Sequence, residues 1–155
     1  GESHYYQGEC YFLNVIDQPG APKVVIHDQI TLDLYVRPGN DLAQRQAVMN
    51  AWYRQHLKAQ IPPLIEKWQP IMGVTVQAWG VKQMKTRWGT CNIRARRIWL
   101  NLELAKRPPR CLEYIVVHEM VHLLERLHNA RFRAFMDQFM PHWRSCKEEL
   151  KHISA

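Results

Sequence analysis

The chain has 155 residues with a formal net charge of +7; 46% of the residues are hydrophobic, 23% charged and 10% aromatic. This composition fits one globular domain and excludes a disordered chain, which would be poorer in aromatic residues. No apolar run approaches the roughly 20 residues of a membrane-spanning helix, so we expect no membrane partner. No secretory signal is visible, which predicts a cytoplasmic location, although the chain begins at Gly1 without a methionine and leaves room for an upstream segment.

The spacing of the four cysteines predicts no disulfide bonds. They lie far apart and form no CxxC pair, which argues against a four-cysteine zinc site. At this length a core forms without disulfides, so we expect free thiols in a reducing compartment. The residues are Cys10, Cys91, Cys111 and Cys146.

The first part of the chain has the pattern of strands. Residues 5–15 are aromatic and β-branched with an internal glycine, which predicts a strand or a hairpin. A turn at 17–20 leads to short β runs at 23–27 and 30–36, and the second run alternates apolar and polar positions as a half-buried strand does.

A helix is expected next. Asp41 follows the breaker sequence Pro38-Gly39-Asn40 and is a candidate N-cap for a helix from Leu42. Apolar residues then recur at helical spacing. Pro62-Pro63 should break or kink this helix, with residues 64–68 as a further helical piece.

The second half predicts two strands followed by helices, so the chain as a whole is predicted to be α+β. The strands are expected at 74–79 and 97–102, with a turn near Asn92 between them. Pro108-Pro109 suits the first turn of a helix, and Asn129 can end it. The predicted helices span residues 112–127, 130–140 and 143–152.

Positive charge is concentrated between Lys82 and Arg110. This segment holds nine basic residues and one acidic residue, Glu103, whereas the rest of the chain is nearly neutral. Such an excess attracts acidic partners, nucleic acid first among them. It also suits a solvated hairpin whose charged edges resist aggregation, and both interpretations remain open. The candidate contact residues are Arg94, Arg96 and Arg97.

The predicted helix at 112–127 carries the motif His118-Glu119-Met120-Val121-His122. Residues four apart on a helix lie one turn apart and about 40° apart around the axis, so both imidazoles can reach one ion. Glu119 points about 100° away from His118, where it can reach water on that ion. His128 follows at the expected end of the helix, and a short turn there could bring it to the same ion. Three protein ligands and an open fourth position define a catalytic zinc site.

In an open site, zinc lowers the pKa of its water toward about 7, and Glu119 accepts the proton and passes it to a leaving amine. Two alternatives stay open from the residues alone. In the first, the two histidines are core residues that hydrogen bonds satisfy, and Glu119 forms an ion pair. In the second, a fourth protein ligand such as Cys146 or His142 closes a structural zinc site. Glu113 and Glu125 are candidate carboxylate partners of the ligand histidines.

Three stretches together carry a family resemblance: 85–91 (KTRWGTC), 97–102 (RIWLNL) and 112–122 (LEYIVVHEMVH). They resemble the YgjP-like metallopeptidase family, a SprT-related group of HExxH zincins. Residues 128–132 are similar to that family's histidine followed by an aromatic residue, and 140–143 to its closing Met-Pro motif. The resemblance is strong from about residue 74 to residue 150 and looser before it.

The resemblance implies a small zincin-like α+β domain, in which a twisted sheet packs on the active-site helix and further helices follow. It implies one YgjP-like domain over residues 1–155, with strands and a helix in 1–73 and the catalytic elements in 74–155. It implies Glu119 as general base, a protein or peptide substrate, and an edge strand flanking Trp88-Gly89 that pairs with the extended substrate. The implied ligands of one Zn²⁺ per chain are His118, His122 and His128.

Some related zincins use a downstream glutamate as third ligand, so Glu148 or Glu149 could take the place of His128, although the spacing favours His128. The leading functional prediction is a zinc-dependent peptidase. The alternative is a nucleic-acid-associated zinc protein that binds through the basic 82–110 segment, and proteolysis of DNA-bound proteins would join the two. A structural-zinc interaction domain is a third hypothesis.

Overall fold

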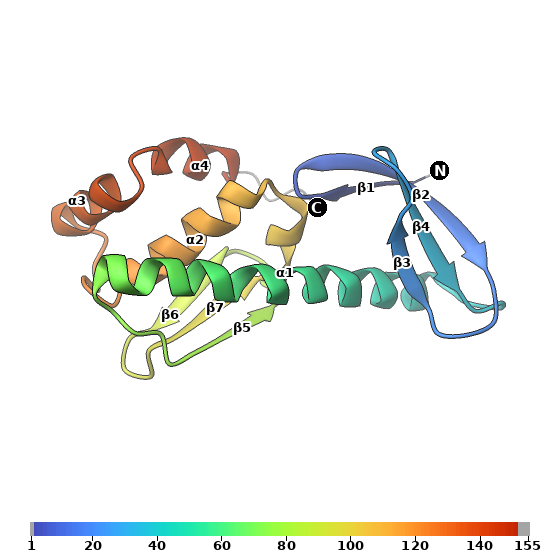
Figure 1. Ribbon diagram of the computed structural model, residues 1–155, viewed down its shortest axis with the longest axis horizontal. Helices are drawn as coiled ribbons and strands as arrows, with labels where there is room; N and C mark the ends of the chain where they lie inside the picture. Colours follow the sequence, from blue (N-terminus) through green and yellow to red (C-terminus); the bar gives the residue numbers. More distant parts are fainter. Residues whose placement is uncertain (1, 152–155) are drawn as a thin grey trace.

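The computed structural model describes residues 2–151, which form two small sheets and four α-helices. One sheet lies at one end of the molecule, and the second sheet and the C-terminal helices lie at the other (Figure 1). A long helix, α1 (Leu42–Met72), runs past both. The predicted α+β class is confirmed. Among residues 2–151, no helix is both long enough and apolar enough to span a membrane.

The N-terminal sheet has the strand order β1-β2-β4-β3. The predicted hairpin is confirmed, because β1 and β2 pair antiparallel across a turn in which Gln7 and Gly8 have positive φ angles of 50° and 84°. The β2 and β4 strands pair in parallel, and β3 closes the other edge. The strands are β1 (Ser3–Tyr6), β2 (Glu9–Asp17), β3 (Lys23–Ile26) and β4 (Thr31–Val36).

Helix α1 (Leu42–Met72) begins as expected and then passes through its prolines. Asp41 accepts the amide of Gln44 and completes a capping box. A break or a kink was expected at Pro62-Pro63; the break is wrong, because the helix is continuous to Met72. Ile61 and Ile65, on either side of the prolines, are both buried in the core, so packing outweighs the lost amide hydrogen bonds.

The second sheet has the order β5-β7-β6, which leaves β6 at an edge. The strand predicted at 97–102 is confirmed, but the one predicted at 74–79 begins later. Val76 donates its amide to the side chain of Gln69 (2.9 Å) instead of to a neighbouring strand, so pairing starts only at Ala78. The strands are β5 (Ala78–Lys82), β6 (Gly89–Asn92) and β7 (Arg97–Asn101).

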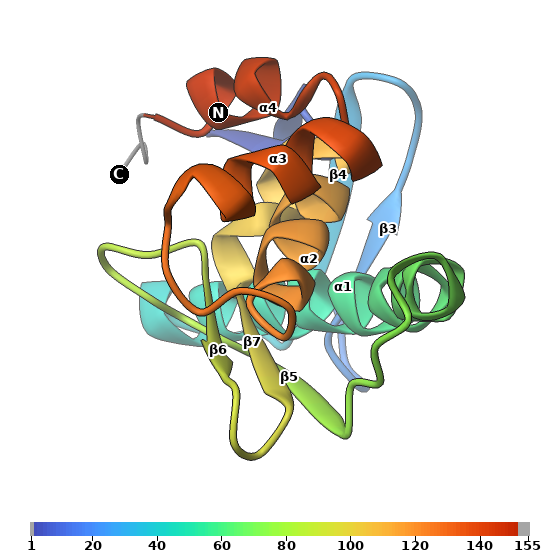
Figure 2. The ribbon, with the colours of Figure 1, turned by 90° about the vertical axis from the view of Figure 1, so that its left-hand side faces the viewer.

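The C-terminal half places α2 between the second sheet on one side and α3 and α4 on the other (Figure 2). The helix predicted at 112–127 is wrong at its end, because α2 stops at Val121 and the chain turns through residues 122–129. Of the helix predicted at 143–152, position 152 lies outside the described residues. The elements are the 3₁₀ helix η1 (Leu102–Lys106), α2 (Pro109–Val121), α3 (Ala130–Phe139) and α4 (Trp143–Glu149).

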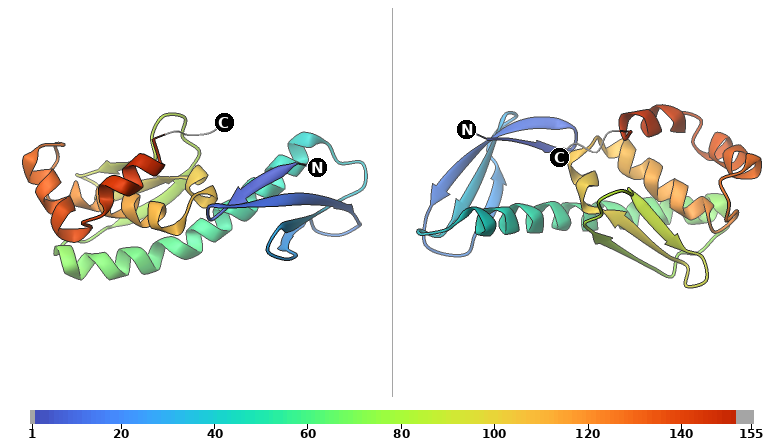
Figure 3. Two further views of the ribbon diagram at one scale, coloured as in Figure 1. Left: turned by 90° about the horizontal axis from the view of Figure 1, so that it is seen from above. Right: turned by 180° about the vertical axis from the view of Figure 1, so that it is seen from behind.

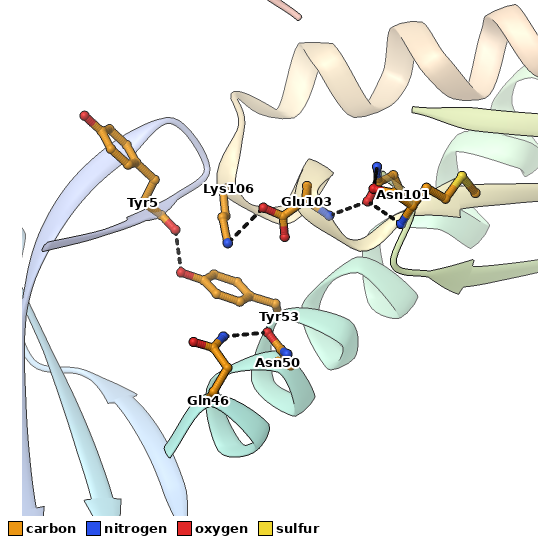
Figure 4. A network of polar contacts seen from close by, with 8 residues as sticks. Tyr5, Gln46, Asn50, Tyr53, Asn101, Glu103 and Lys106 are labelled. Atoms are coloured by element: carbon orange, nitrogen blue, oxygen red, sulfur yellow. Dashed lines mark hydrogen bonds and ion pairs between the residues drawn. The ribbon is translucent and has the colours of Figure 1, made fainter. Parts of the chain in front are cut away.

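Polar contacts join the N-terminal sheet to the second half of the chain (Figure 4). The hydroxyl of Tyr53 on α1 donates to the carbonyl of Tyr5 at 2.6 Å, and the Tyr53 ring also lies beneath the ammonium of Lys106. Lys106 in turn pairs with Glu103 at 3.0 Å. One strand end, the long helix and η1 are therefore held together just before α2 begins.

The β1–β2 turn docks directly on the start of α2. The amides of Gln7 and Gly8 donate to the carbonyls of Ala105 and Lys106, each at 3.0 Å. A Cβ on Gly8 would lie 2.9 Å from Cγ of Pro108, so only glycine allows this approach. The β1–β2 turn thus packs against the start of α2, the helix that carries the HExxH motif, and the view from behind in Figure 3 shows this end of the N-terminal sheet beside that helix.

Candidate metal centre and active-site cleft

Helix α2 presents His118 and Glu119, and His122 caps its end. Strand β6 packs so closely on this helix that Gly89 has no room for a side chain. A Cβ there would lie 2.8 Å from Cγ2 of Ile115 and 3.1 Å from Cγ of Glu119. Glycine at this position therefore lets the edge strand lie beside the motif helix.

The turn after α2 brings His128 back to the helix. Glu125 organises this turn through its carboxylate, which accepts the amide of Leu127 at 3.2 Å and the side-chain amide of Asn129 at 3.1 Å. Asn129 caps α3 by accepting the amide of Phe132. The early end of α2 is thus stabilised by side chains of the turn itself.

The structure brings His118, His122 and His128 together. Each offers one ring nitrogen, and these atoms lie within 4.8 Å of one another. Nε2 of His118 and Nε2 of His128 are 3.2 Å apart. Two nitrogens bound to one tetrahedral zinc at 2.0–2.1 Å would be about 3.3 Å apart, so this spacing fits a shared ion. The ring of Phe132 packs against all three imidazoles, with centroids 4.7–5.0 Å away.

The hydrogen bonds of the histidines also suit metal binding. Nδ1 of His122 lies 3.2 Å and 3.1 Å from the carbonyls of Glu125 and Arg126, so it carries the proton and leaves Nε2 as the ligand atom. Burial and the neighbouring histidines lower the pKa of His118 to about 3, which keeps its ring neutral. Its Nδ1 is buried and has no partner among residues 2–151.

Glu119 is buried beside this cluster, with 5% of its surface exposed. Burial raises the pKa of Glu119 to about 8, and the charge of Arg87 acts in the opposite direction. Within the described part of the chain it forms no ion pair, so the alternative in which it is a paired core residue has no support.

The other ligand and carboxylate candidates lie apart from the histidine cluster. Glu113 accepts hydrogen bonds from Lys67 and Trp68 on α1. Glu149 pairs with Arg110, and the exposed Glu148 pairs with Lys151. The thiol of Cys146 donates toward a backbone carbonyl. Among residues 2–151, the potential metal ligands that cluster in this way are the three histidines.

The histidines and Glu119 line a cleft of about 1170 Å³. Its floor is α2, one wall is formed by residues 86–91, and the other wall comes from the turn after α2, α3 and α4. Of the basic 82–110 segment, only Arg87 lines this cleft. Arg94 and Arg96 are exposed in the β6–β7 turn, and Arg97 is half-buried on β7.

The remaining basic residues of the cleft were not predicted, because they are scattered among turns and helices that are separate in the sequence. They are Arg126, Arg133, Arg144, Lys147 and Lys151.

Comparison with solved structures defines the class of fold. The chain is similar to the metallopeptidase zymogen abylysin of Pyrococcus abyssi, with a TM-score of 0.52 and 17% identity over 57% of this chain and 89% of that one. The zymogen of Methanocaldococcus jannaschii jannalysin gives a TM-score of 0.48 and 14% identity over 57% and 90%. The likeness to abylysin shows that the matched 57% of the chain has the fold of zincin-like metallopeptidases, as expected.

The family follows from sequence. The family model described as YgjP-like, metallopeptidase domain matches residues 1–153, and the chain belongs to this family. The predicted resemblance is confirmed, and the protein is a metal-dependent peptidase by family. No curated protein matches the chain.

Proposed function

We propose that this chain is a zinc-dependent peptidase in which His118, His122 and His128 hold one Zn²⁺ and Glu119 is the general base. The observation that carries the proposal is the histidine cluster at the base of the cleft, with its 3.2 Å spacing between two Nε2 atoms. Imidazole nitrogens in a set of three, with room for a further ligand, suit a catalytic zinc.

A bound zinc would supply Lewis-acid chemistry and lower the pKa of the water it carries. Glu119 would accept a proton from the attacking water and deliver it to the leaving amine. Its position directly after His118, buried beside the histidine cluster, supports this role, and a bound zinc would favour the charged carboxylate that accepts the proton. Phe132 would hold the three rings in place from the side.

Strand β6 is the proposed docking edge for the substrate. Within residues 2–151 it is paired on one side only, with β7, and Gly89, Thr90 and Cys91 line the cleft. An extended peptide can add to such an edge through backbone hydrogen bonds. The scissile bond would then lie over α2.

The test compares Glu119→Gln with the wild type. We expect Glu119→Gln to retain about one zinc per chain by mass spectrometry and to lose peptide hydrolysis, while Glu66→Gln, an exposed change on α1, leaves both unchanged. His128→Ala should lose zinc, and His142→Ala should keep it. Equal hydrolysis by Glu119→Gln and wild type would refute the general-base role. A structural zinc site would instead make His118→Ala unfold, with Glu119→Gln unchanged in every assay.

A second candidate is association with nucleic acid through Arg94, Arg96 and Arg97. The observation in its favour is that Arg94 and Arg96 are exposed at the tip of the β6–β7 turn. Salt-dependent DNA binding that is lost on charge reversal at these positions would support it. No binding at low salt would leave the turn as solvated surface.

We further propose that residues 1–155 work as one peptidase domain, in which 1–73 supports the catalytic part at 74–155. The docking of the β1–β2 turn on the start of α2 supports this arrangement.

The four cysteines are free, which supports a reducing compartment such as the cytoplasm.

A further inference from the structure

The cleft around the candidate metal centre is lined by basic side chains on both walls. Among the residues that the structure describes, six cations line it, against two carboxylates, Glu119 and Glu148. Arg87 lies on the wall next to β6, and the other five lie on the opposite wall. We call these six residues the cleft cations: Arg87, Arg126, Arg133, Arg144, Lys147 and Lys151.

Most of this charge is not neutralised by the protein. Arg144 pairs with Asp137 at 2.7 Å, and Lys151 lies 3.7 Å from Glu148. The other four cleft cations have no ion pair within residues 2–151, and all four are exposed. A concave surface with charges of one sign on facing walls focuses its potential on whatever lies between them.

We propose that the cleft selects acidic segments of polypeptide, with Asp and Glu side chains close to the scissile bond. This inference rests on the proposed peptidase function and specifies its substrate class. A peptide paired with β6 would extend along the cleft and direct alternate side chains toward the walls. Carboxylates there would meet Arg87 on one side and Arg126 or Lys147 on the other. Basic segments would be repelled by the same charges.

The position of the cleft cations favours polypeptide over nucleic acid. They line the same cleft as the histidine cluster, beside a strand edge that is unpaired within residues 2–151 and whose amides and carbonyls match another peptide backbone. The exposed cations of the β6–β7 turn, Arg94 and Arg96, are the surface that suits nucleic acid, and they do not line the cleft.

Binding should be measured with zinc-loaded Glu119→Gln, which holds substrate without cleaving it. The probes are fluorescent peptides of one length in which the charged positions are Glu, Gln or Lys, together with single-stranded DNA. We expect the Glu peptide to bind about tenfold more tightly than the Gln peptide, with an affinity that falls as salt rises. The Lys peptide should bind least.

Charge-reversal variants test whether the preference for the Glu peptide arises in the cleft. Arg126→Glu with Lys147→Glu should weaken binding of the Glu peptide about tenfold, because two exposed attractive pairs are replaced by repulsive ones. Lys58→Glu reverses one charge on the exposed surface of α1, as Arg126→Glu or Lys147→Glu alone does in the cleft, and should change binding less than about twofold. Zinc content and melting temperature are measured for each variant. Where a reversal lowers either one, Arg126→Gln and Lys147→Gln replace it.

The outcomes separate this inference from the proposed function. Equal affinity for the Glu and Gln peptides, or equal losses in the cleft variant and Lys58→Glu, would overturn the acidic preference. DNA that displaces the Glu peptide would do the same in favour of nucleic acid. If wild type cleaves a proteome-derived peptide library without enrichment of Asp and Glu near the cut, the peptidase function stands and the preference fails. If the Glu peptide binds as expected but no peptide is cleaved, the preference stands and the peptidase function fails.

Discussion

Gly89 is the point at which the edge strand and the motif helix touch, so Gly89→Ala tests how tightly the proposed active site is built. The added Cβ would lie 2.8 Å from Cγ2 of Ile115. Ordinary carbon contacts are about 3.5–4.0 Å, so one side must move by about 0.7 Å or more. The same Cβ would lie 3.1 Å from Cγ of Glu119 and 3.1 Å from the carbonyl oxygen of Trp99, which leaves little space on the other sides.

The expected cost has two parts. Overpacking of a close contact costs about 1–3 kcal/mol of the free energy of unfolding. For a chain of this size that corresponds to a fall in melting temperature of about 2–12 °C. A shift of Glu119 by a fraction of an ångström should also lower kcat/KM by about tenfold to a hundredfold, since misplacement of about 1 Å can cost a hundredfold.

The matched control is Gly80→Ala on β5, the far edge of the same sheet. Its Cβ would clash with Cζ3 of the Trp99 ring and lie 2.8 Å from Cε3, and Trp99 does not line the cleft. Both variants are compared by thermal unfolding, zinc content and peptide hydrolysis. We expect both to lose stability, and only Gly89→Ala to lose activity with zinc retained. Full activity in Gly89→Ala would refute the reasoning that the edge strand fixes the position of Glu119.

Three further predictions test the surroundings of the site. Glu125→Ala removes the carboxylate that holds the amide of Leu127 and the side chain of Asn129, so zinc affinity should fall about tenfold to a hundredfold, while Glu66→Ala, measured in the same chelator competition, should leave it unchanged. Asn101→Ala removes a fully buried amide that binds the carbonyls of Met84 and Arg87 at 3.1 and 2.7 Å, and the free energy of unfolding in urea should fall by about 3 kcal/mol. Burial acts to raise the pKa of Glu113, but hydrogen bonds from Lys67 and Trp68 outweigh burial and lower this pKa. The charged carboxylate therefore stabilises the fold above its ordinary pKa of 4.5, and this contribution is lost progressively as the pH falls below that value. The melting temperature of Lys67→Met should therefore fall less on acidification than that of wild type, and parallel curves would show that this pair does not contribute.

Local patterns predicted the elements wherever the local signal and the packing agree. Asp41 has both a capping side chain and a helix-forming sequence after it, and the hairpin at the N-terminus has Gly8 at its turn. The predicted break at Pro62-Pro63 was wrong because burial of Ile61 and Ile65 maintains the helix against local propensity. The strand predicted at 74–79 was wrong at its start because a side chain of α1, Gln69, takes up the amide of Val76.

The cleft could be predicted only in part. The HExxH spacing identifies two imidazoles on one helix because four residues make one turn, whatever surrounds the helix. The cleft cations show no such pattern, since Arg87, Arg126 and Lys147 come from three segments that only the tertiary fold brings to one cleft. The local charge excess at 82–110 instead marked the β6–β7 turn, whose exposed arginines lie outside the cleft.

The third histidine shows how a site can depend on a helix that ends early. Had α2 continued to residue 127 as its apolar run suggests, 128 would lie six residues beyond 122, about 9 Å further along the axis and on another side of the helix. The chain instead leaves the helix at His122, whose Nδ1 is held by the carbonyls of Glu125 and Arg126, and the side chain of Glu125 fixes the return. The turn that brings His128 to the cluster is therefore the same turn that orients His122. Loss of Glu125 should consequently disturb two of the proposed ligands at once, which is why we expect its effect on zinc affinity to exceed that of any single hydrogen bond.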